Sequence, residues 1–208
     1  MAVTAATSLV RGAILGFSIA APVGPIGVLC IRRSISSGRW IGLATGLGAA
    51  TADAIYGAIA AFGLTGVSAF LVGQHFWLGL IGGLFLCWLG VRTFSGRPAE
   101  RGTSEREASA FASYASTFVL TITNPMTILA FVAMFAGLGL GAAADWTGAA
   151  ALVSGVFLGS AVWWMILSGV AGLLRERMTP GKMGWVNRAS GVVITAFGAY
   201  ALASVIVR

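Results

Sequence analysis

Six long apolar stretches occupy most of this chain, and they restrict its fold more than any other feature. They cover roughly residues 8–31, 39–64, 67–93, 111–138, 146–174 and 186–207. Each is long enough for a helix to cross the hydrocarbon core of a bilayer, which takes about 20 mainly apolar residues. The sequence therefore predicts an all-α polytopic membrane protein with six transmembrane helices in the lipid bilayer.

The composition excludes a soluble fold. Of 208 residues, 58% are hydrophobic and 9% are charged, whereas roughly a quarter of a typical soluble domain is charged. The net charge is +7, but the basic residues flank the apolar stretches, where they set membrane orientation, so we expect no nucleic-acid partner. His75 is the single histidine, and Cys30 and Cys87 lie far apart in the sequence. We therefore expect no metal site, no cofactor and no redox pair.

The lysines and arginines predict how the chain is oriented. Eleven of the 13 lie in or beside the first, third and fifth linkers, and the other two are Arg11 and Arg208. Because basic linkers remain in the cytoplasm, both termini are expected on the outer side. An odd number of additional spans would break this alternation, so the charges support the count of six independently.

The two halves of the chain resemble each other weakly. We expect one transmembrane domain, residues 1–208, with repeat 1 at about 8–94, a cytoplasmic linker at about 95–110 and repeat 2 at about 111–208. In the second helix of each half, matching positions hold Gly48, Asp53 and Tyr56 against Gly155, Ser160 and Trp163. Three spans per half is an odd number, so the second half must enter the membrane from the opposite side. This predicts two inverted three-helix repeats, an architecture common among secondary transporters.

Prolines interrupt the first helix of each half. Pro22 and Pro25 flank Gly24 in the first span, and Asn124 precedes Pro125 at the corresponding place in the fourth. A proline inside a helix removes a hydrogen bond and clashes with the preceding turn, so we expect both helices to be broken. Lipid cannot satisfy the freed backbone groups, which places each break in protein or in a wet cavity. Matched interruptions point to a binding site; the alternative is a pair of kinks that serve packing alone.

Asp53 is the single acidic residue within an apolar stretch, near the middle of the second one. An ionised carboxylate there costs at least about 2.5 kcal/mol, so it should face the bundle interior and either pair or protonate. We expect Asp53 to bind a substrate ammonium group, to carry a coupling proton, or to do both. The alternative is a structural hydrogen bond to Tyr56 or to backbone opened by the breaks.

Four further residues are weaker candidates. Arg32 and Arg33 follow the broken helix and would attract a carboxylate at the cytoplasmic mouth; the alternative is that they anchor the chain at the lipid headgroups. Trp163 and Ser160 would form a pocket wall, and the alternative for Trp163 is packing within the bundle. Glycines four residues apart recur on several helices, which permits close helix packing and a homodimer.

The order and spacing of these motifs resemble the lysine-exporter (LysE/RhtB) family. The resemblance rests on the Pro-x-Gly-Pro break, Gly38 to Gly48 leading to Asp53, Thr123-Asn124-Pro125 and Gly159 to Trp164. It covers nearly the whole chain. It implies a transporter rather than an enzyme, in the bacterial inner membrane, which exports amino acids or closely related small metabolites and is driven by protons.

The commoner break in that family is Pro-Gly-Pro followed by a polar residue. Here Val23 is inserted and Ile26 follows, which favours a substrate other than lysine, threonine or homoserine.

The residues and the resemblance together predict a mechanism. The two broken helices meet at the midplane, and amides near Gly24 or Asn124 receive the substrate carboxylate, because helix dipoles favour an anion there. Asp53 receives the amino group or the proton, and one three-helix unit rocks against the other.

A divalent-cation exporter of the same superfamily architecture is the alternative, although one aspartate, one asparagine and dispersed cysteines are few cation ligands. An enzyme would need a nucleophile with a base, or paired acids, at membrane depth.

Overall fold

The computed structural model describes residues 5–62, 73–95, 109–124, 127–128, 130–131 and 146–206, and over that part of the chain it contains helices and no strand. In chain order the helices are α1 (Ala5–Ala20), α2 (Pro25–Ser37), α3 (Arg39–Ala61), α5 (His75–Phe94), α6 (Ala110–Ile122), α8 (Trp146–Leu173), the 3-10 turn η1 (Arg175–Arg177) and α9 (Pro180–Ile206). The predicted all-α fold class is confirmed for the described residues.

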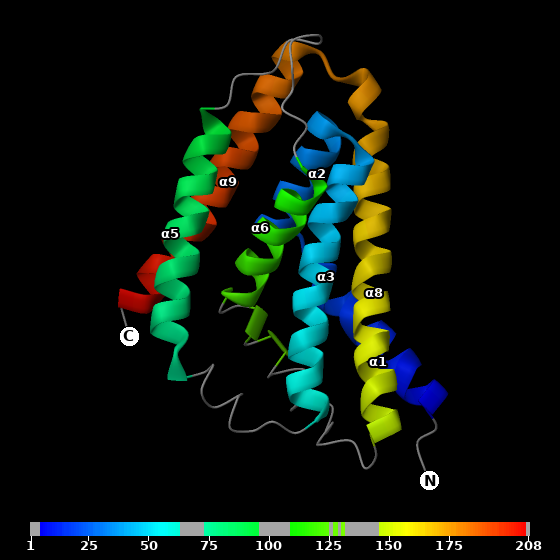
Figure 1. Ribbon diagram of the computed structural model, residues 1–208. Coiled ribbons are helices and arrows are strands. Elements are labelled where there is room, and N and C mark those ends of the chain that lie inside the picture. The colour runs from blue at the N-terminus through cyan, green and yellow to red at the C-terminus, as the bar shows by residue number, and fades with distance from the viewer. Residues whose placement is uncertain are drawn as a thin grey trace.

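The helices form one elongated bundle (Figure 1). α1 packs along α8, α3 lies between α6 and α8, and α5 pairs with α9. α2 connects these groups, because it contacts α3, α8 and α9. The start of α1 and the end of α9 lie at the same end of the bundle.

The first span is interrupted where the prolines predict it. α1 ends at Ala20, α2 begins at Pro25, and the two helices are bent by 82° relative to each other. Gly24 is extended, with φ −92° and ψ −164°. Pro25 is the first helical residue, a position where the missing N–H would have no partner in any case. The break therefore turns the chain sharply and leaves the buried N-terminus of α2 without a side-chain cap.

Three described helices are long and apolar enough to cross a membrane: α3, α5 from Phe76, and α8 continued through η1. The bent pair α1 and α2 makes a fourth span if it is counted as one. α6 is apolar and has 13 residues, and most of the predicted span 111–138 beyond it, including Pro125, lies outside the described residues. α9 begins at Pro180, earlier than residue 186, because the helix extends through polar residues that the hydropathy pattern assigned to a linker.

Glycines let pairs of helices approach until their backbones touch. On α8, a Cβ at Gly155 would overlap the carbonyl oxygen of Leu9 on α1, and a Cβ at Gly159 would overlap that of Ala13. Small residues at such spacings allow close packing in membranes, where no hydrophobic effect drives helices together. The glycines of α8 therefore allow α1 to pack directly against the backbone of α8.

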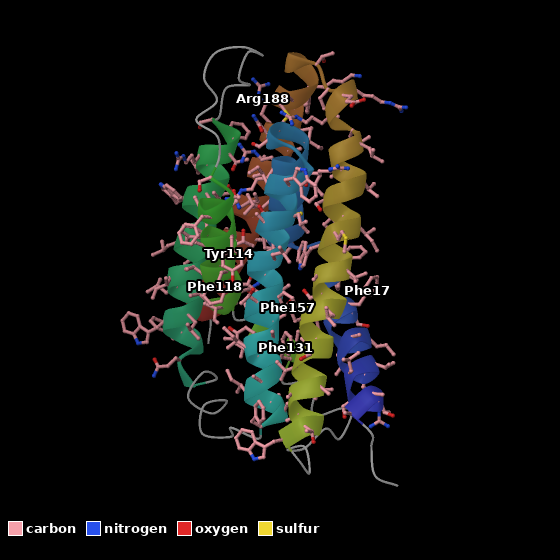
Figure 2. The ribbon with its side chains drawn as sticks, turned by 45° about the vertical axis from the view of Figure 1, so that its right-hand side comes forward. Phe17, Tyr114, Phe118, Phe131, Phe157 and Arg188 are labelled. Carbon is pink, nitrogen blue, oxygen red and sulfur yellow. The ribbon has the colours of Figure 1, made fainter. Side chains whose placement is uncertain are left out.

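Basic residues gather at the end of the bundle opposite to the chain termini, which we call the basic end. It carries the start of α3 with Arg39, η1 with Arg175 and Arg177, and the start of α9 with Lys182 and Arg188. Arg188 is labelled there in Figure 2. The basic residues that the sequence places in alternate linkers thus lie mainly at one end of the bundle.

Asp53 lies between two clusters of buried apolar side chains. Ala49 and Trp164 belong to one cluster, and Tyr56 and Val156 belong to the other. Because Ala49 and Tyr56 are on α3, one turn to either side of Asp53, the carboxylate lies at the junction of the two halves of the core.

Candidate functional site

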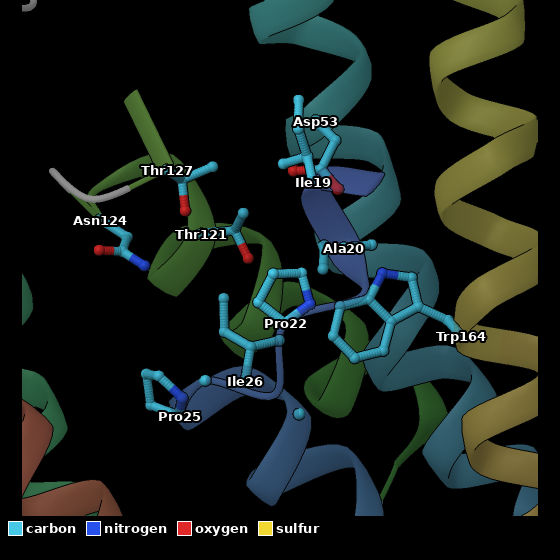
Figure 3. Close-up of a pocket in the computed structure, with 13 residues that line it drawn as sticks. Ile19, Ala20, Pro22, Pro25, Ile26, Asp53, Thr121, Asn124, Thr127 and Trp164 are labelled. Atoms are coloured by element: carbon cyan, nitrogen blue, oxygen red, sulfur yellow. The ribbon is translucent and has the colours of Figure 1, made fainter. Parts of the chain in front are cut away.

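A cavity of about 100 Å³ lies at the break between α1 and α2. Its walls come from the α1–α2 connection, from α3, from the end of α6 with the residues after it, and from α8. Figure 3 shows Thr121, Asn124 and Thr127 on one side of the cavity, Trp164 on the other, and Asp53 at one end. Polar groups from several helices therefore converge on one small space.

Five of the residues singled out in the sequence line this cavity. They are Pro22, Gly24, Pro25, Asp53 and Asn124. They come from three separate parts of the chain, and the fold brings them together because α2, α3 and α6 contact one another.

A chain of hydrogen bonds holds Asp53 in place. Asp53 is 3% exposed, and its Oδ2 accepts a hydrogen bond of 2.7 Å from the Ser160 hydroxyl. Ser160 Oγ in turn accepts a hydrogen bond of 3.1 Å from Trp164 Nε1. Ser160 and Trp164 share a face of α8 because they are four residues apart. Tyr56 does not bond to Asp53; its hydroxyl donates instead to the carbonyl oxygen of Ile122, at the end of α6.

The N-terminus of α2 lines the cavity with backbone amides that have no acceptor among the described residues. Gly24, Pro25, Ile26 and Gly27 line the cavity, and no side chain caps the helix. The N–H groups of Ile26 and Gly27 donate to no described residue, whereas that of Val28 already donates to the Gly24 carbonyl at 3.0 Å. The aligned peptide dipoles add a partial positive charge at this position. This wall of the cavity therefore suits an anionic group.

Asn124 stands where α6 ends and helical backbone begins again. Its N–H donates to the Thr121 carbonyl at 3.1 Å, and its own carbonyl accepts from the N–H groups of Thr127 and Ile128 at 3.1 and 3.3 Å. The chain thus restarts a helical turn beside the cavity, as it does after Gly24. Pro125, the residue predicted to cause this break, lies outside the described residues.

Trp163 lies on a different face of α8 from the cavity. Its ring packs edge-on against Phe17 of α1, with the ring centroids 5.4 Å apart. Its Nε1 is buried and has no hydrogen-bond partner among the described residues. Adjacent residues of a helix project about 100° apart, so two consecutive tryptophans cannot both face one small cavity. Trp164, and not Trp163, lines it.

Arg33 of α2 connects three helices between the cavity and the basic end. Its Nη1 donates to Thr45 Oγ1 on α3 and to Ser113 O and Thr117 Oγ1 on α6, each at 3.1 Å, and its Nη2 donates to Ser116 Oγ at 3.0 Å. The three hydroxyls donate to carbonyl oxygens of their own helices, which leaves their lone pairs for the guanidinium. We call these five residues the Arg33 cluster.

Arg32 points toward the other side of α2. Its Nε donates to Asn187 Oδ1 on α9 at 3.0 Å, and Asn187 is 4% exposed. Arg32 and Arg33 are both half-buried and bonded to neighbouring helices. This position differs from the alternative considered for them, in which both arginines would anchor the chain at the lipid headgroups. Neither lines the cavity.

Metal ligands do not gather in the part of the chain that the structure describes. That part holds no group of three or more His, Cys, Asp or Glu residues placed to bind an ion. The free thiols of Cys30 and Cys87 lie on different helices, α2 and α5. Asp53 is the one acidic residue among those that line the cavity.

The fold and the cavity define a helical membrane protein with a polar site inside its bundle. The family model described as LysE type translocator matches residues 17–204. The chain therefore belongs to the LysE type translocators, a family of transporters rather than enzymes, as the motifs indicated.

Named relatives resemble the chain over most of its length. A putative amino acid efflux protein, YcgF of Bacillus subtilis (strain 168), is 28% identical over 192 residues, which cover 90% of this chain and 91% of that protein. The threonine efflux protein of Salmonella typhi is 23% identical over 190 residues, 87% of this chain and 90% of that protein. The uncharacterized membrane protein YahN of Escherichia coli (strain K12) is 27% identical over 171 residues, 80% and 76% of the two chains. No solved structure gives a significant match.

Proposed function

We propose that this protein exports an amino acid, or a closely related small metabolite, from the cytoplasm in exchange for protons. The observation that carries the proposal is the pairing of a buried acid with a free helix N-terminus at one cavity. An amino acid carries an anionic and a cationic group, and these two walls complement them. Membership of the LysE type translocators and the efflux names of two relatives support this substrate class.

Each wall of the cavity has a role in this proposal. The substrate carboxylate binds the amides of Ile26 and Gly27, because the α2 dipole favours an anion there. Asp53 receives the ammonium group or, after the substrate leaves, a proton. The apolar part of the substrate lies against Trp164. The volume of about 100 Å³ is far below the roughly 300–1,000 Å³ of pockets that take drug-sized ligands, which supports a small metabolite.

The transport cycle in this proposal is alternating access between two inverted repeats with six spans. In Figure 1, the pair α1 and α2 runs toward the basic end, α3 runs away from it, and α5 runs toward it. In the second half, α6 runs away from the basic end, α8 runs toward it, and α9 runs away from it. In the proposed repeat, α6, α8 and α9 correspond to α1, α3 and α5. The helix contacts agree with this correspondence, because α1 packs on α8 as α6 packs on α3, and the corresponding helices α3 and α8, and α5 and α9, pack on each other. This pattern is what a twofold axis in the membrane plane would produce.

Equivalent residues make equivalent contacts, which further supports the repeat. Gly48 of α3 lies against the carbonyl oxygen of Tyr114 on α6, and its counterpart Gly155 of α8 lies against that of Leu9 on α1. Asp53 and Ser160, matched by the same spacing, bond directly to each other. Two equivalent positions can touch only on the symmetry axis, so Asp53 lies where the proposed repeats meet.

The basic end gives the bundle an orientation in the membrane in this proposal. We place the basic end in the cytoplasm of a bacterial cell and both termini on the outer side of the inner membrane, because cytoplasmic loops carry the excess of Lys and Arg. Substrate then enters from the basic end, past the Arg33 cluster.

The Arg33 cluster acts as the cytoplasmic gate in this scheme. α2 runs from the cavity at Pro25 toward the basic end, and Arg33 lies eight residues, about 12 Å, along it. Its hydrogen bonds hold α2 against α6. These helices belong to different repeats, so they must separate when the cavity opens to the cytoplasm. All the acceptors are neutral, and bonds of this kind are weaker than a bond to a carboxylate.

Replacing Arg33 with Gln should open this gate. Gln keeps at most part of the network, and losing about 2 kcal/mol of hydrogen bonding should raise the open fraction at least about tenfold. The buried native Cys30, on the preceding turn of α2, reports the change as faster maleimide labelling in a Cys87→Ser background. Ser36→Ala is the matched control, because Ser36 is on the same helix and its hydroxyl bonds within α2, to Arg33 O and Ser37 Oγ. Equal labelling of Cys30 in the two variants would rule out the gate.

The proposed function is tested by ligand binding followed by transport. Purified protein is screened by thermal shift against the twenty amino acids, their small analogues and divalent metal salts. A ligand that binds only the folded state adds about 2.7 kcal/mol at one hundred times its Kd, so we expect a clear rise in melting temperature with one or a few amino acids. The ligand found should then leave proteoliposomes in response to an inward proton gradient. Stabilisation by metal salts alone would replace the proposal with a divalent-cation exporter.

A further inference from the structure

A second, larger cavity of about 380 Å³ lies at the basic end, away from the site at Asp53. It is formed by the α2–α3 corner on one side and by the end of α8 with η1 on the other. α3 and the helix from α8 through η1 are both long and apolar enough to span a membrane. The cavity therefore lies where two candidate spans end, which is where we expect lipid headgroups.

Two guanidinium groups line this second cavity. Arg39 and Arg175 are exposed, and within the described ranges neither side chain has an ion pair or a hydrogen bond to another residue. Arg39 lies over the ring of Trp40, 5.0 Å from its centroid. Arg175 Nη1 lies against Gly38, where an added Cβ would be only 2.8 Å away. Glu176 also lines the cavity and forms no ion pair with either arginine, so the lining keeps an excess positive charge.

The apolar part of the same cavity matches acyl chains. Trp40 is 68% exposed and Leu173 is 75% exposed, and both line the cavity. Tryptophan is enriched at the level of lipid headgroups because one part of its ring system is apolar and the other polar. Gly169 also lines the cavity, and the space beside it is open, since a Cβ there would meet nothing within 4 Å; we call this open space the notch. Cationic groups and an apolar notch thus lie side by side.

We propose that this cavity binds the headgroup of an anionic phospholipid. The phosphate lies between Arg39 and Arg175, and the start of an acyl chain follows the notch at Gly169 beside Leu173. Basic pockets between helices on the cytoplasmic side are suited to anionic headgroups. The apolar notch distinguishes a lipid from free phosphate, which would use the arginines alone. The bound lipid joins the α2–α3 corner to the end of α8, and this inference does not depend on the transported substrate.

The experiment measures lipid retention on the purified full-length protein by native mass spectrometry, and thermal stability with added phosphatidylglycerol, phosphatidylethanolamine or glycerol phosphate. Phosphatidylglycerol should be retained and should stabilise the protein, and the other two should not. Each arginine near an anionic surface contributes about fivefold, so Arg39→Gln with Arg175→Gln should weaken retention by about thirtyfold. Gly169→Leu should weaken it as well, because the new side chain fills the notch without removing charge. Arg188→Gln, an exposed basic residue of α9 at the same end, is the matched control.

Four results would contradict this inference. Equal retention by the wild type and the double arginine variant would show that the charges do not bind the lipid. Equal stabilisation by glycerol phosphate and phosphatidylglycerol would reduce the site to a simple anion site. A loss in Arg188→Gln as large as in the double variant would show a general effect of surface charge. A folded Gly169→Leu protein that retains lipid as well as the wild type would exclude the notch.

Discussion

Asp53→Asn is expected to abolish proton-coupled efflux, with a fall of at least about a hundredfold. Asn keeps the size of the side chain and can still accept the hydrogen bond that Ser160 donates at 2.7 Å, so the bundle should insert and fold as before. The amide can neither take up a proton nor pair with an ammonium group. Efflux is measured in proteoliposomes under an imposed proton gradient, and folding is measured by the melting temperature.

Two substitutions on α8 serve as comparisons for Asp53→Asn. Ser160→Ala removes the hydrogen bond to Asp53 while keeping the acid, and we expect a partial loss of about tenfold, the size of one charge-assisted hydrogen bond. Ser168→Ala removes a buried hydroxyl that donates only to its own helix, at Met165 O, and should leave efflux unchanged. Undiminished efflux by Asp53→Asn would remove the acid from the mechanism.

Gly155→Val is expected to destabilise the whole bundle, by about 3 kcal/mol or more. Any side chain at Gly155 would overlap the Leu9 carbonyl of α1. A backbone atom cannot move aside as the end of a flexible side chain can, so α1 must separate from α8. Denaturation in mixed micelles should show the loss, and the yield of folded protein should fall with it.

Gly169→Val is the matched control, because Gly169 is on the same helix and a Cβ there would meet no atom within 4 Å. Its stability should stay close to that of the wild type, apart from any change in bound lipid. If the two variants were equally stable, the close approach of α1 and α8 would not matter for folding.

The sequence predicted the break in the first span because proline has a strong local effect. Pro22 and Pro25 each remove a backbone hydrogen bond and clash with the preceding turn whatever surrounds them, and α1 and α2 are separated at that place. The burial of Asp53 followed from the cost of exposing a carboxylate to lipid, and its 3% exposure agrees. Both predictions depend on single residues and on the solvent, and neither requires knowledge of how the helices pack.

Other features depend on packing and could not be predicted. Nothing in the sequence says which of Trp163 and Trp164 faces the cavity, because that depends on the rotation of α8 about its axis. Arg32 and Arg33 are at a typical place for headgroup anchors, yet hydroxyls on α3 and α6 and the amide of Asn187 draw them between the helices. Those partners are up to 155 residues away in the sequence, and only the fold brings them near.

The bond between Asp53 and Ser160 has a consequence for energetics. The two positions are equivalent in the proposed repeat, but one holds an ionisable group and the other a neutral hydroxyl. A carrier with a carboxylate at both positions could pick up two charges in each turnover. Among the described residues that line the cavity, Asp53 alone is acidic, so the proposed exchange is expected to use at most one proton per substrate molecule. Under that mechanism, the movement of one proton down its electrochemical gradient would set the steepest substrate concentration ratio across the membrane.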